Sequence, residues 1–240
     1  MTLHYITYNS TTSKSLGIYV SGGSSFDAAA PDYTSYEIPG KNGDLQINND
    51  RYKNIDVTYP VFIPGGFESS VQAVRNWMRS ADGYVELSDT YDTTHYRLAR
   101  GKDVLSFSPT AQNVGANFRL VFDCKPQRFI TSAYAQVTLT SGQILNNTTQ
   151  YVALPRFQLD GVTNGGTLTV ANSLGTVTMT ATSTRSQTTY IDCETCNIYY
   201  SSTNLNSLFS GDFPVFAPGN NTITFSGITS VKVRPRYWEL

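Results

Sequence analysis

The sequence predicts a mainly β fold, and three observations support this. Hydrophobic residues make up 40% of the 240 residues and charged residues only 15%, with 16 Tyr and 12 Phe, a balance typical of aromatic-rich sheets. Apolar residues alternate with polar ones over short segments that Gly, Pro and Asn separate, as in antiparallel strands. A single segment has the apolar period of a helix.

The charge balance bears on the kind of partner. The formal charge is -1 and the isoelectric point about 6.1, so the chain lacks the basic surface that phosphate backbones or anionic lipids attract. The first eight residues alternate like a strand and have neither the charged start nor the apolar core of a signal peptide. No apolar stretch approaches the roughly 18 residues of a membrane span. We therefore expect synthesis in a cytoplasm and neutral partners, either protein or glycan.

The densest turn signal lies at residues 38–45. Gly40 and Gly43 can adopt positive φ without a Cβ clash, Asn42 tolerates it, and Pro39 biases Ile38 toward extended geometry. The run therefore predicts a tight structural turn between two strand-like segments, and a hairpin is the simplest form of it.

One helix is predicted after residue 66. Short strand candidates continue to residue 63, where Pro64 and the two following glycines end the pattern. Ser69 and Gln72 have the spacing of a capping box, and apolar residues recur every three to four positions over residues 70–81. Gly83 is the expected C-terminal stop, and one face of the helix should pack on a sheet.

A β-arm is predicted next. Residues 84–87 and 95–99 read as strands, and the Asp- and Thr-rich residues 88–94 between them read as a polar loop. Residues 117–124 form a last alternating strand before Pro126.

Composition changes near residue 130, which suggests two domains at residues 1–132 and 133–240. Thirteen of the 18 carboxylates and twelve of the 17 Lys and Arg residues precede this point. Residues 131–149 are small and polar, and short alternating runs follow. Even spacing of this kind predicts two antiparallel sheets packed face to face. The expected strands are residues 153–159, 167–171, 176–181, 188–192, 197–201, 221–226 and 230–234, with turns at Gly161, Asn164-Gly165-Gly166, residues 172–175, residues 218–220 and Gly227.

Cys193 and Cys196 have the spacing of a redox pair or of half a zinc site. A redox pair requires a helix N-terminus, whereas strand-like segments flank these thiols. A zinc site requires two more ligands, and the chain offers only Cys124, His4 and His95, all in the other half. We expect a turn with two incidental thiols and no metal or other cofactor.

The sequence contains no recognisable catalytic signature. It lacks a nucleophile elbow, a phosphate-binding loop and a dinucleotide fingerprint, and its two histidines, His4 and His95, are expected at surface or partly packed positions. The second half has five carboxylates, and a glycosidase needs two, but nothing in the sequence pairs them. No catalytic residue is therefore expected, and the chain is not predicted to be an enzyme.

Aromatic residues of the second half could contact a glycan or a partner protein. Tyr199, Tyr200 and Trp238 are the candidates, although most aromatics here are explained by core packing. Tyr199 and Tyr200 must point to opposite faces if they share a strand, so at most one of them can line a given surface.

Four motifs together resemble the distal tail protein of siphophages that infect Gram-positive bacteria. Besides residues 38–45, these are Tyr59-Pro60-Val61-Phe62, the segment 122–129 and the closing Arg234-Pro235-Arg236-Tyr237-Trp238. The resemblance covers nearly the whole chain. Many relatives have a second Trp where this chain has Tyr237.

This resemblance implies a ring-forming N-terminal domain, β-sandwich-like with one helix and a β-arm, and a C-terminal galectin-like antiparallel β-sandwich. It implies a structural, non-enzymatic protein of the phage tail tip, forming a hexameric ring that joins the tail tube to the baseplate or tail fibre. Expected partners are the major tail protein, the tape measure protein, a tail-tip protein and a receptor-binding protein. The competing interpretation is a carbohydrate-binding module or adhesin that recognises host wall saccharide.

Overall fold

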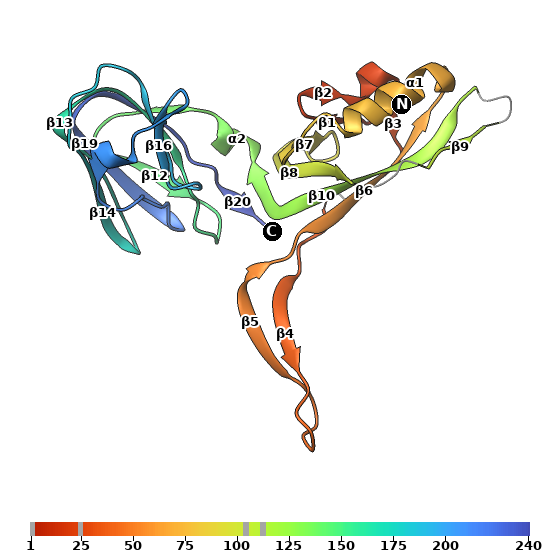
Figure 1. Ribbon diagram of the computed structural model, residues 1–240, viewed down its shortest axis with the longest axis horizontal. Helices are drawn as coiled ribbons and strands as arrows, with labels where there is room; N and C mark the ends of the chain where they lie inside the picture. Colours follow the sequence, from red (N-terminus) through yellow and green to blue (C-terminus); the bar gives the residue numbers. More distant parts are fainter. Residues whose placement is uncertain (1–2, 24–25, 103–105, 111–113) are drawn as a thin grey trace. The chain divides into compact units, whose positions relative to one another are not determined.

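The computed structural model describes residues 3–23, 26–102, 106–110 and 114–240. The chain divides into two compact units, the first ending at Arg128 and including Leu240, the second formed by Phe129–Glu239. Both units consist of antiparallel strands with little helix, so the predicted mainly β class is confirmed (Figure 1). In the described ranges, no helix has the length and hydrophobicity that a membrane crossing requires.

The first unit is built on one antiparallel sheet with the strand order β2-β1-β7-β8-β10-β6-β3, and β9 also pairs with β10. The strands β10 and β6 pair without interruption from Ala116 opposite Ile63 to Cys124 opposite Ile55. Alternate residues of both strands are buried, as the period of two predicts. The bounds are β1 Ile6–Tyr8, β2 Thr11–Thr12, β3 Tyr19–Val20, β6 Ile55–Ile63, β7 Val85–Asp89, β8 His95–Lys102, β9 Ser108–Pro109 and β10 Ala116–Ile130, and a 3-10 helix η1 spans Ser13–Leu16.

The helix α1 spans Phe67–Met78, three residues earlier than predicted at both ends. The predicted capping box is wrong, because the N-cap is Gly66 at φ 69° and Ser69 lies inside the first turn, donating to the Gly66 carbonyl at 2.9 Å. The Gly83 stop is also wrong, since the helix ends five residues before it. The backbone at the N-cap is left-handed, a conformation that glycine adopts readily. The capping-box rule considers only the spacing of side chains and therefore misses a glycine cap.

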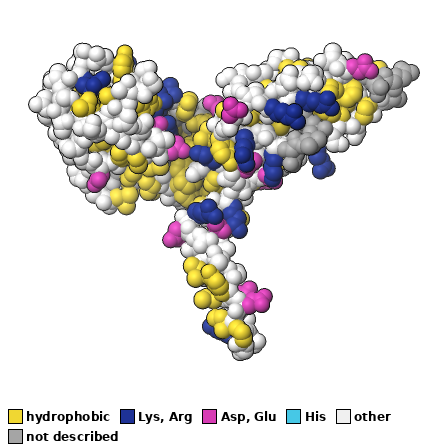
Figure 2. All heavy atoms as spheres, in the orientation of Figure 1, with side chains coloured by type: hydrophobic (Ala, Val, Ile, Leu, Met, Phe, Trp, Pro, Cys, Tyr) yellow, Lys and Arg dark blue, Asp and Glu magenta, His cyan; other side chains and the backbone are white. Residues whose placement is uncertain are grey.

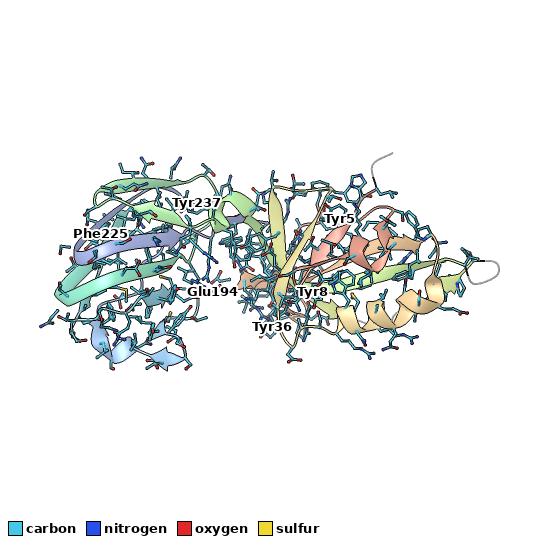
Figure 3. All side chains as sticks on the ribbon, turned by 90° about the horizontal axis from the view of Figure 1, so that it is seen from above. Tyr5, Tyr8, Tyr36, Glu194, Phe225 and Tyr237 are labelled. Atoms are coloured by element: carbon cyan, nitrogen blue, oxygen red, sulfur yellow. The ribbon has the colours of Figure 1, made fainter. Side chains whose placement is uncertain are left out.

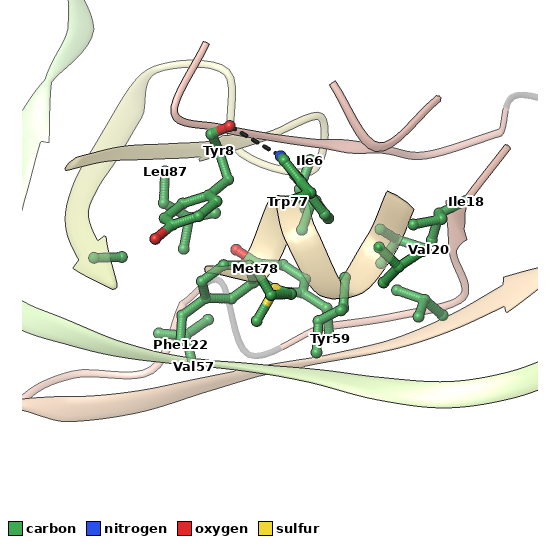
Figure 4. Close-up of a cluster of buried hydrophobic side chains, with 14 of the residues drawn as sticks. Ile6, Tyr8, Ile18, Val20, Val57, Tyr59, Trp77, Met78, Leu87 and Phe122 are labelled. Carbon is green, nitrogen blue, oxygen red and sulfur yellow. Dashed lines mark hydrogen bonds between the residues drawn. The ribbon is translucent and has the colours of Figure 1, made fainter. Parts of the chain in front are cut away.

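One face of α1 packs into the core of the first unit, as predicted (Figure 4). Trp77 is 4% exposed, and its indole N–H donates to the Tyr8 carbonyl at 3.1 Å. The Tyr8 ring meets the Trp77 ring edge to face at 5.9 Å and lies 5.0 Å from the Phe122 ring. These three aromatics therefore join the helix to β1 and to β10.

The β-arm exists, but it lies elsewhere in the chain than predicted. The arm is the two-stranded sheet of β4 (Pro31–Tyr36) and β5 (Leu45–Tyr52), which pairs with no other strand of the described chain. The predicted strands 84–87 and 95–99 are instead β7 and β8, inside the main sheet. The start of their polar loop is fixed by the Asp89 carboxylate, which accepts hydrogen bonds from the N–H groups of Tyr91 and Asp92.

The second unit forms its two layers from one continuous sheet. The long strands β13 (Arg156–Asn172) and β19 (Gly219–Arg234) pair over most of their length, with a register shift between Val162 and Thr167. Before the shift β13 pairs with β15, and after it β13 pairs with β14. The other bounds are β11 Val137–Leu139, β12 Gln143–Asn147, β14 Gly175–Ala181, β15 Thr189–Asp192, β16 Asn197–Tyr200, β17 Thr203–Asn204, β18 Phe209–Ser210, β20 Trp238–Glu239, with short helices α2 Thr131–Tyr134 and η3 Asn206–Leu208.

Some predicted turns of the second unit are wrong. Gly161, the 164–166 run and Gly227 lie inside β13 and β19, where they let the strands bend instead of ending them. A Cβ at Gly166 would lie 2.8 Å from the Gly227 carbonyl, so the two backbones approach too closely for a side chain. The strands β11 and β12 occupy part of the polar segment 131–149, for which no strand was predicted.

Candidate assembly surface and the C-terminal segment

The β4–β5 arm presents apolar side chains that its own chain leaves exposed. Tyr36 is the cross-strand partner of Leu45, and Thr34 is the partner of Ile47, so these side chains share one face. Tyr36 is 52% exposed, Leu45 49% and Ile47 48%. We call Tyr36, Leu45 and Ile47 the apolar face of the arm; Figure 2 shows hydrophobic side chains gathered along this hairpin.

The predicted turn 38–45 is the tip of the arm. Gly40 has φ 79° and Gly43 has φ 80°, which confirms that both glycines adopt the left-handed conformation. Neither would bring a Cβ within 4 Å of other atoms, so the requirement is one of backbone conformation alone. Asn42 is exposed beside Gly43, and the tip forms an open hollow of about 380 Å³ lined by Glu37, Ile38, Pro39, Lys41, Gly43 and Asp44.

Ion pairs hold the base of the arm. Asp32 is 5% exposed, and its carboxylate lies 2.6 Å from the Arg51 guanidinium and 3.3 Å from the Lys53 ammonium. The hydrogen bond from Arg51 is the main cause that keeps the pKa of Asp32 below its usual value. Since Asp32 lies on β4 and Arg51 on β5, the charges close the hairpin at the end opposite its tip.

Of the three predicted contact residues of the second unit, two lie on β16 and the third on β20. Tyr199 stacks on Tyr190 with ring centroids 5.4 Å apart, and Tyr200 is 41% exposed on the other side of β16. Trp238 stacks on Tyr151 at 4.3 Å and donates its indole N–H to the Val152 carbonyl at 2.9 Å. Both stacked pairs have one ring face covered from within the unit, which favours a packing role for Tyr199 and Trp238.

Arg236, which belongs to the closing 234–238 motif, has structural partners that the residue patterns alone do not predict. Its guanidinium donates two hydrogen bonds to Asp192, at 2.8 and 3.0 Å, and lies 3.4 Å from Glu194 (Figure 3, where Glu194 and Tyr237 are labelled). Burial raises the pKa of Asp192, but the hydrogen bonds from Arg236 outweigh burial and leave it below its usual value. The pair fastens the segment before β20 to the turn after β15.

The Cys193–Cys196 pair occupies this same β15–β16 turn, as expected of two residues in a turn. Cys193 is 3% exposed, burial raises the pKa of its thiol, and Cys196 is exposed at φ 49°. The Cys193 thiol therefore stays protonated at neutral pH, and the residues that the structure describes contain no group of three or more metal-ligating side chains.

The two histidines have partners that explain their positions. The His4 ring stacks on Tyr91 at 4.0 Å, and its Nδ1 lies 3.1 Å from the Thr90 hydroxyl. His95 Nδ1 lies 2.9 Å from the Asp92 carboxylate, which also accepts a hydrogen bond from Arg128 at 2.5 Å. Burial would raise the pKa of Asp92, but hydrogen bonds from Thr94 and Arg128 hold it well below its usual range. These contacts form a partly buried structural network around the β7–β8 loop.

Neither a protein-family profile nor a curated protein matches the sequence, whereas solved structures do. The SPP1 Dit protein, described as a paradigm of the hub adsorption apparatus in phages infecting Gram-positive bacteria, superposes with a TM-score of 0.69 at 12% identity over 97% of this chain and 98% of that one. A chain of the phage P2 baseplate in its activated conformation with Ca gives 0.57 at 9% identity, covering 97% of each chain. The Sr form gives 0.55 at 8%, covering 96% of each. The chain therefore shares, over nearly its full length, the fold of phage hub and baseplate proteins.

Proposed function

We propose that this protein is a structural component of a phage tail tip, a distal tail protein that forms a hexameric ring. In this proposal residues 1–132 form the ring, and residues 133–240 form an outer galectin-like sandwich. The near-complete coverage of the SPP1 Dit fold supports it. The ring would join the tail tube to the baseplate or fibre in the virion, contacting the major tail protein, the tape measure protein, a tail-tip protein and a receptor-binding protein.

The apolar face of the arm is the observation that carries the proposal. A two-stranded ribbon is marginally stable by itself in water, and its unpaired edges and exposed apolar side chains favour association. Tyr36, Leu45 and Ile47 lie about half exposed on one face of such a ribbon. Closed rings are built from heterologous contacts, in which a surface of one subunit meets a different surface of the next. The arm fits the first of these two surfaces.

Two matched variants test the role of the arm in the full-length protein. Ile47→Asp places a charge on the apolar face, and Gln46→Asp places the same charge on the neighbouring residue, which points to the opposite face. We expect Ile47→Asp to abolish rings seen by electron microscopy and light scattering, with unchanged thermal melting, while Gln46→Asp still forms them. Rings of equal yield from both variants, or a wild-type chain that stays monomeric even in assembled virions, would refute the proposal.

A monomeric carbohydrate-binding module has less support. Its candidate residues Tyr199 and Trp238 each use a ring face for packing within the unit, and Tyr200 lies on another surface. The oligomer size in solution separates the two functions, since a module of that class needs no ring.

A further inference from the structure

The tip of the arm carries a chemically reactive dipeptide. We propose that Asn42 is a site of spontaneous covalent modification, in which its side-chain amide converts to a carboxylate through a cyclic imide formed with Gly43. The chain has two Asn-Gly dipeptides, Asn42-Gly43 and Asn164-Gly165, and the structure distinguishes them.

The reaction needs no cofactor or oxidant. After losing its proton to hydroxide, the Gly43 backbone nitrogen attacks the Asn42 Cγ atom; the new C–N bond closes a five-membered imide, and the amide nitrogen leaves as ammonia. Water then adds to either imide carbonyl, which gives aspartate or an isoaspartate whose backbone runs through the former side chain. Asparagine is among the chemically labile residues of proteins, and loss of its side-chain amide is one cause.

The geometry at the tip favours this attack. Asn42 and Gly43 are both exposed and lie outside the strands of the arm. Gly43 has no Cβ to shield its nitrogen, and no atom lies within 4 Å of the position that a Cβ would occupy. Within the described residues, the Gly43 N–H makes no hydrogen bond that would have to break, and the nearest turn contact is from the Lys41 N–H to the Ile38 carbonyl at 3.1 Å.

The second dipeptide is restrained where the first is not. Asn164 lies inside β13, and its N–H donates to the Thr184 hydroxyl at 3.0 Å. The next glycine, Gly166, packs directly against the Gly227 backbone. Gly165 itself is as open as Gly43, so the restraint lies in the Asn164 backbone, whose hydrogen bond to Thr184 would have to break as the dipeptide turns into the attacking geometry. Asn164 therefore serves as an internal control with the same Asn-Gly dipeptide.

Modification would change the surface of the tip. Glu37 and Asp44 outnumber Lys41 there, so the tip already has a formal charge of -1, and a carboxylate at residue 42 makes it -2. Isoaspartate additionally lengthens the backbone at a turn that two left-handed glycines define. A consequence for assembly rests on the proposed ring function, whereas the modification itself does not.

Peptide mapping by mass spectrometry tests the inference on the unassembled full-length protein, incubated at neutral and at mildly alkaline pH. We expect the peptide with Asn42 to gain the mass of an amide-to-acid conversion and to become a substrate for isoaspartyl methylation, faster at the higher pH. The peptide with Asn164 should stay unmodified at the same time points. Gly43→Ala should slow the conversion several-fold, and Asn42→Gln, which would need a six-membered ring, should remove it.

Conversion of Asn164 at the rate of Asn42, or an Asn42 amide that persists at alkaline pH while a synthetic peptide of residues 37–45 converts, would overturn the inference. Because the readout is made on unassembled chains, its failure is distinct from a failure to form rings. Repeating the incubation on assembled particles then shows whether the ring protects the tip.

Discussion

Replacing Trp77 should separate the contribution of indole volume from that of its hydrogen bond. The side chain is 4% exposed, contacts Tyr8 edge to face, and donates to the Tyr8 carbonyl at 3.1 Å. Trp77→Ala removes the ring from the core, which costs about 3–5 kcal/mol for residues of this size. Trp77→Phe keeps most of the apolar volume but leaves the Tyr8 carbonyl without its donor, which costs about 1–3 kcal/mol.

The assay must report the first unit separately, because a chain of two compact units need not unfold in one step. The protein has two tryptophans, Trp77 in the first unit and Trp238 in the second. Fluorescence of Trp238 therefore follows the second unit in both variants, and circular dichroism follows the whole chain. At about 2–8 °C per kcal/mol for domains of this size range, the first transition should fall clearly further in Trp77→Ala than in Trp77→Phe.

Two results would refute this reasoning. Equal melting temperatures for the two variants would mean that the ring volume of Trp77 contributes nothing to the core. A shift of the Trp238 transition in either variant would mean that the two units do not unfold separately.

Three further changes are predictable from the same structure. Gly43→Val should reduce ring yield, because a β-branched residue at φ 80° costs about 1–3 kcal/mol at the tip of the arm. Equal ring yield for Gly43→Ala and Gly43→Val would contradict this. Cys196→Ser should leave the melting temperature unchanged, whereas Cys193→Ser should lower the free energy of unfolding by about 1–3 kcal/mol, because it buries a hydroxyl in the core. Stoichiometric zinc in the purified protein would contradict the incidental role of both thiols. The pKa of the Asp192 carboxylate is lower in the folded than in the unfolded chain, so the stability that Asp192 provides is present above the unfolded pKa near 4 and is lost as the pH falls through the folded pKa. Arg236→Ala should flatten this dependence of unfolding free energy on pH, measured by urea titrations between about pH 5 and 2. An unchanged dependence would exclude the Arg236–Asp192 pair as its source.

The sequence predicts the fold class well and the arm only in part. Alternation over short runs identifies most strands of the core sheets, because burial of one face imposes a period of two. The arm escapes this rule, since β5 is exposed along nearly its whole length and reads as the polar segment LQINNDRY. The dense turn at residues 38–45 was the available signal for it, and it correctly predicted positive φ at Gly40 and Gly43.

The errors in the second unit have a common physical cause. Glycine marks chain reversal in most turns, but Gly161 and Gly227 allow two strands to bend together while they stay paired. A local sequence pattern cannot distinguish a glycine in a turn from a glycine at a bend within a strand, because the bend depends on the partner strand, which is distant in the sequence. The Arg236–Asp192 pair is equally invisible, since it joins residues far apart in the sequence.

The bent β13–β19 ladder also determines how this unit can form. Arg156 pairs with Arg234 near one end of the ladder, and Ala171 pairs with Thr222 near the other, so every rung closes a long loop. Closing such a long loop costs conformational entropy before the strand contacts that compensate for this cost have formed, and this slows folding. On the ribosome, β13 is complete well before β19 exists, and until then it can pair only with β14 and β15. The second unit should therefore fold late and in one cooperative step, triggered by the synthesis of β19.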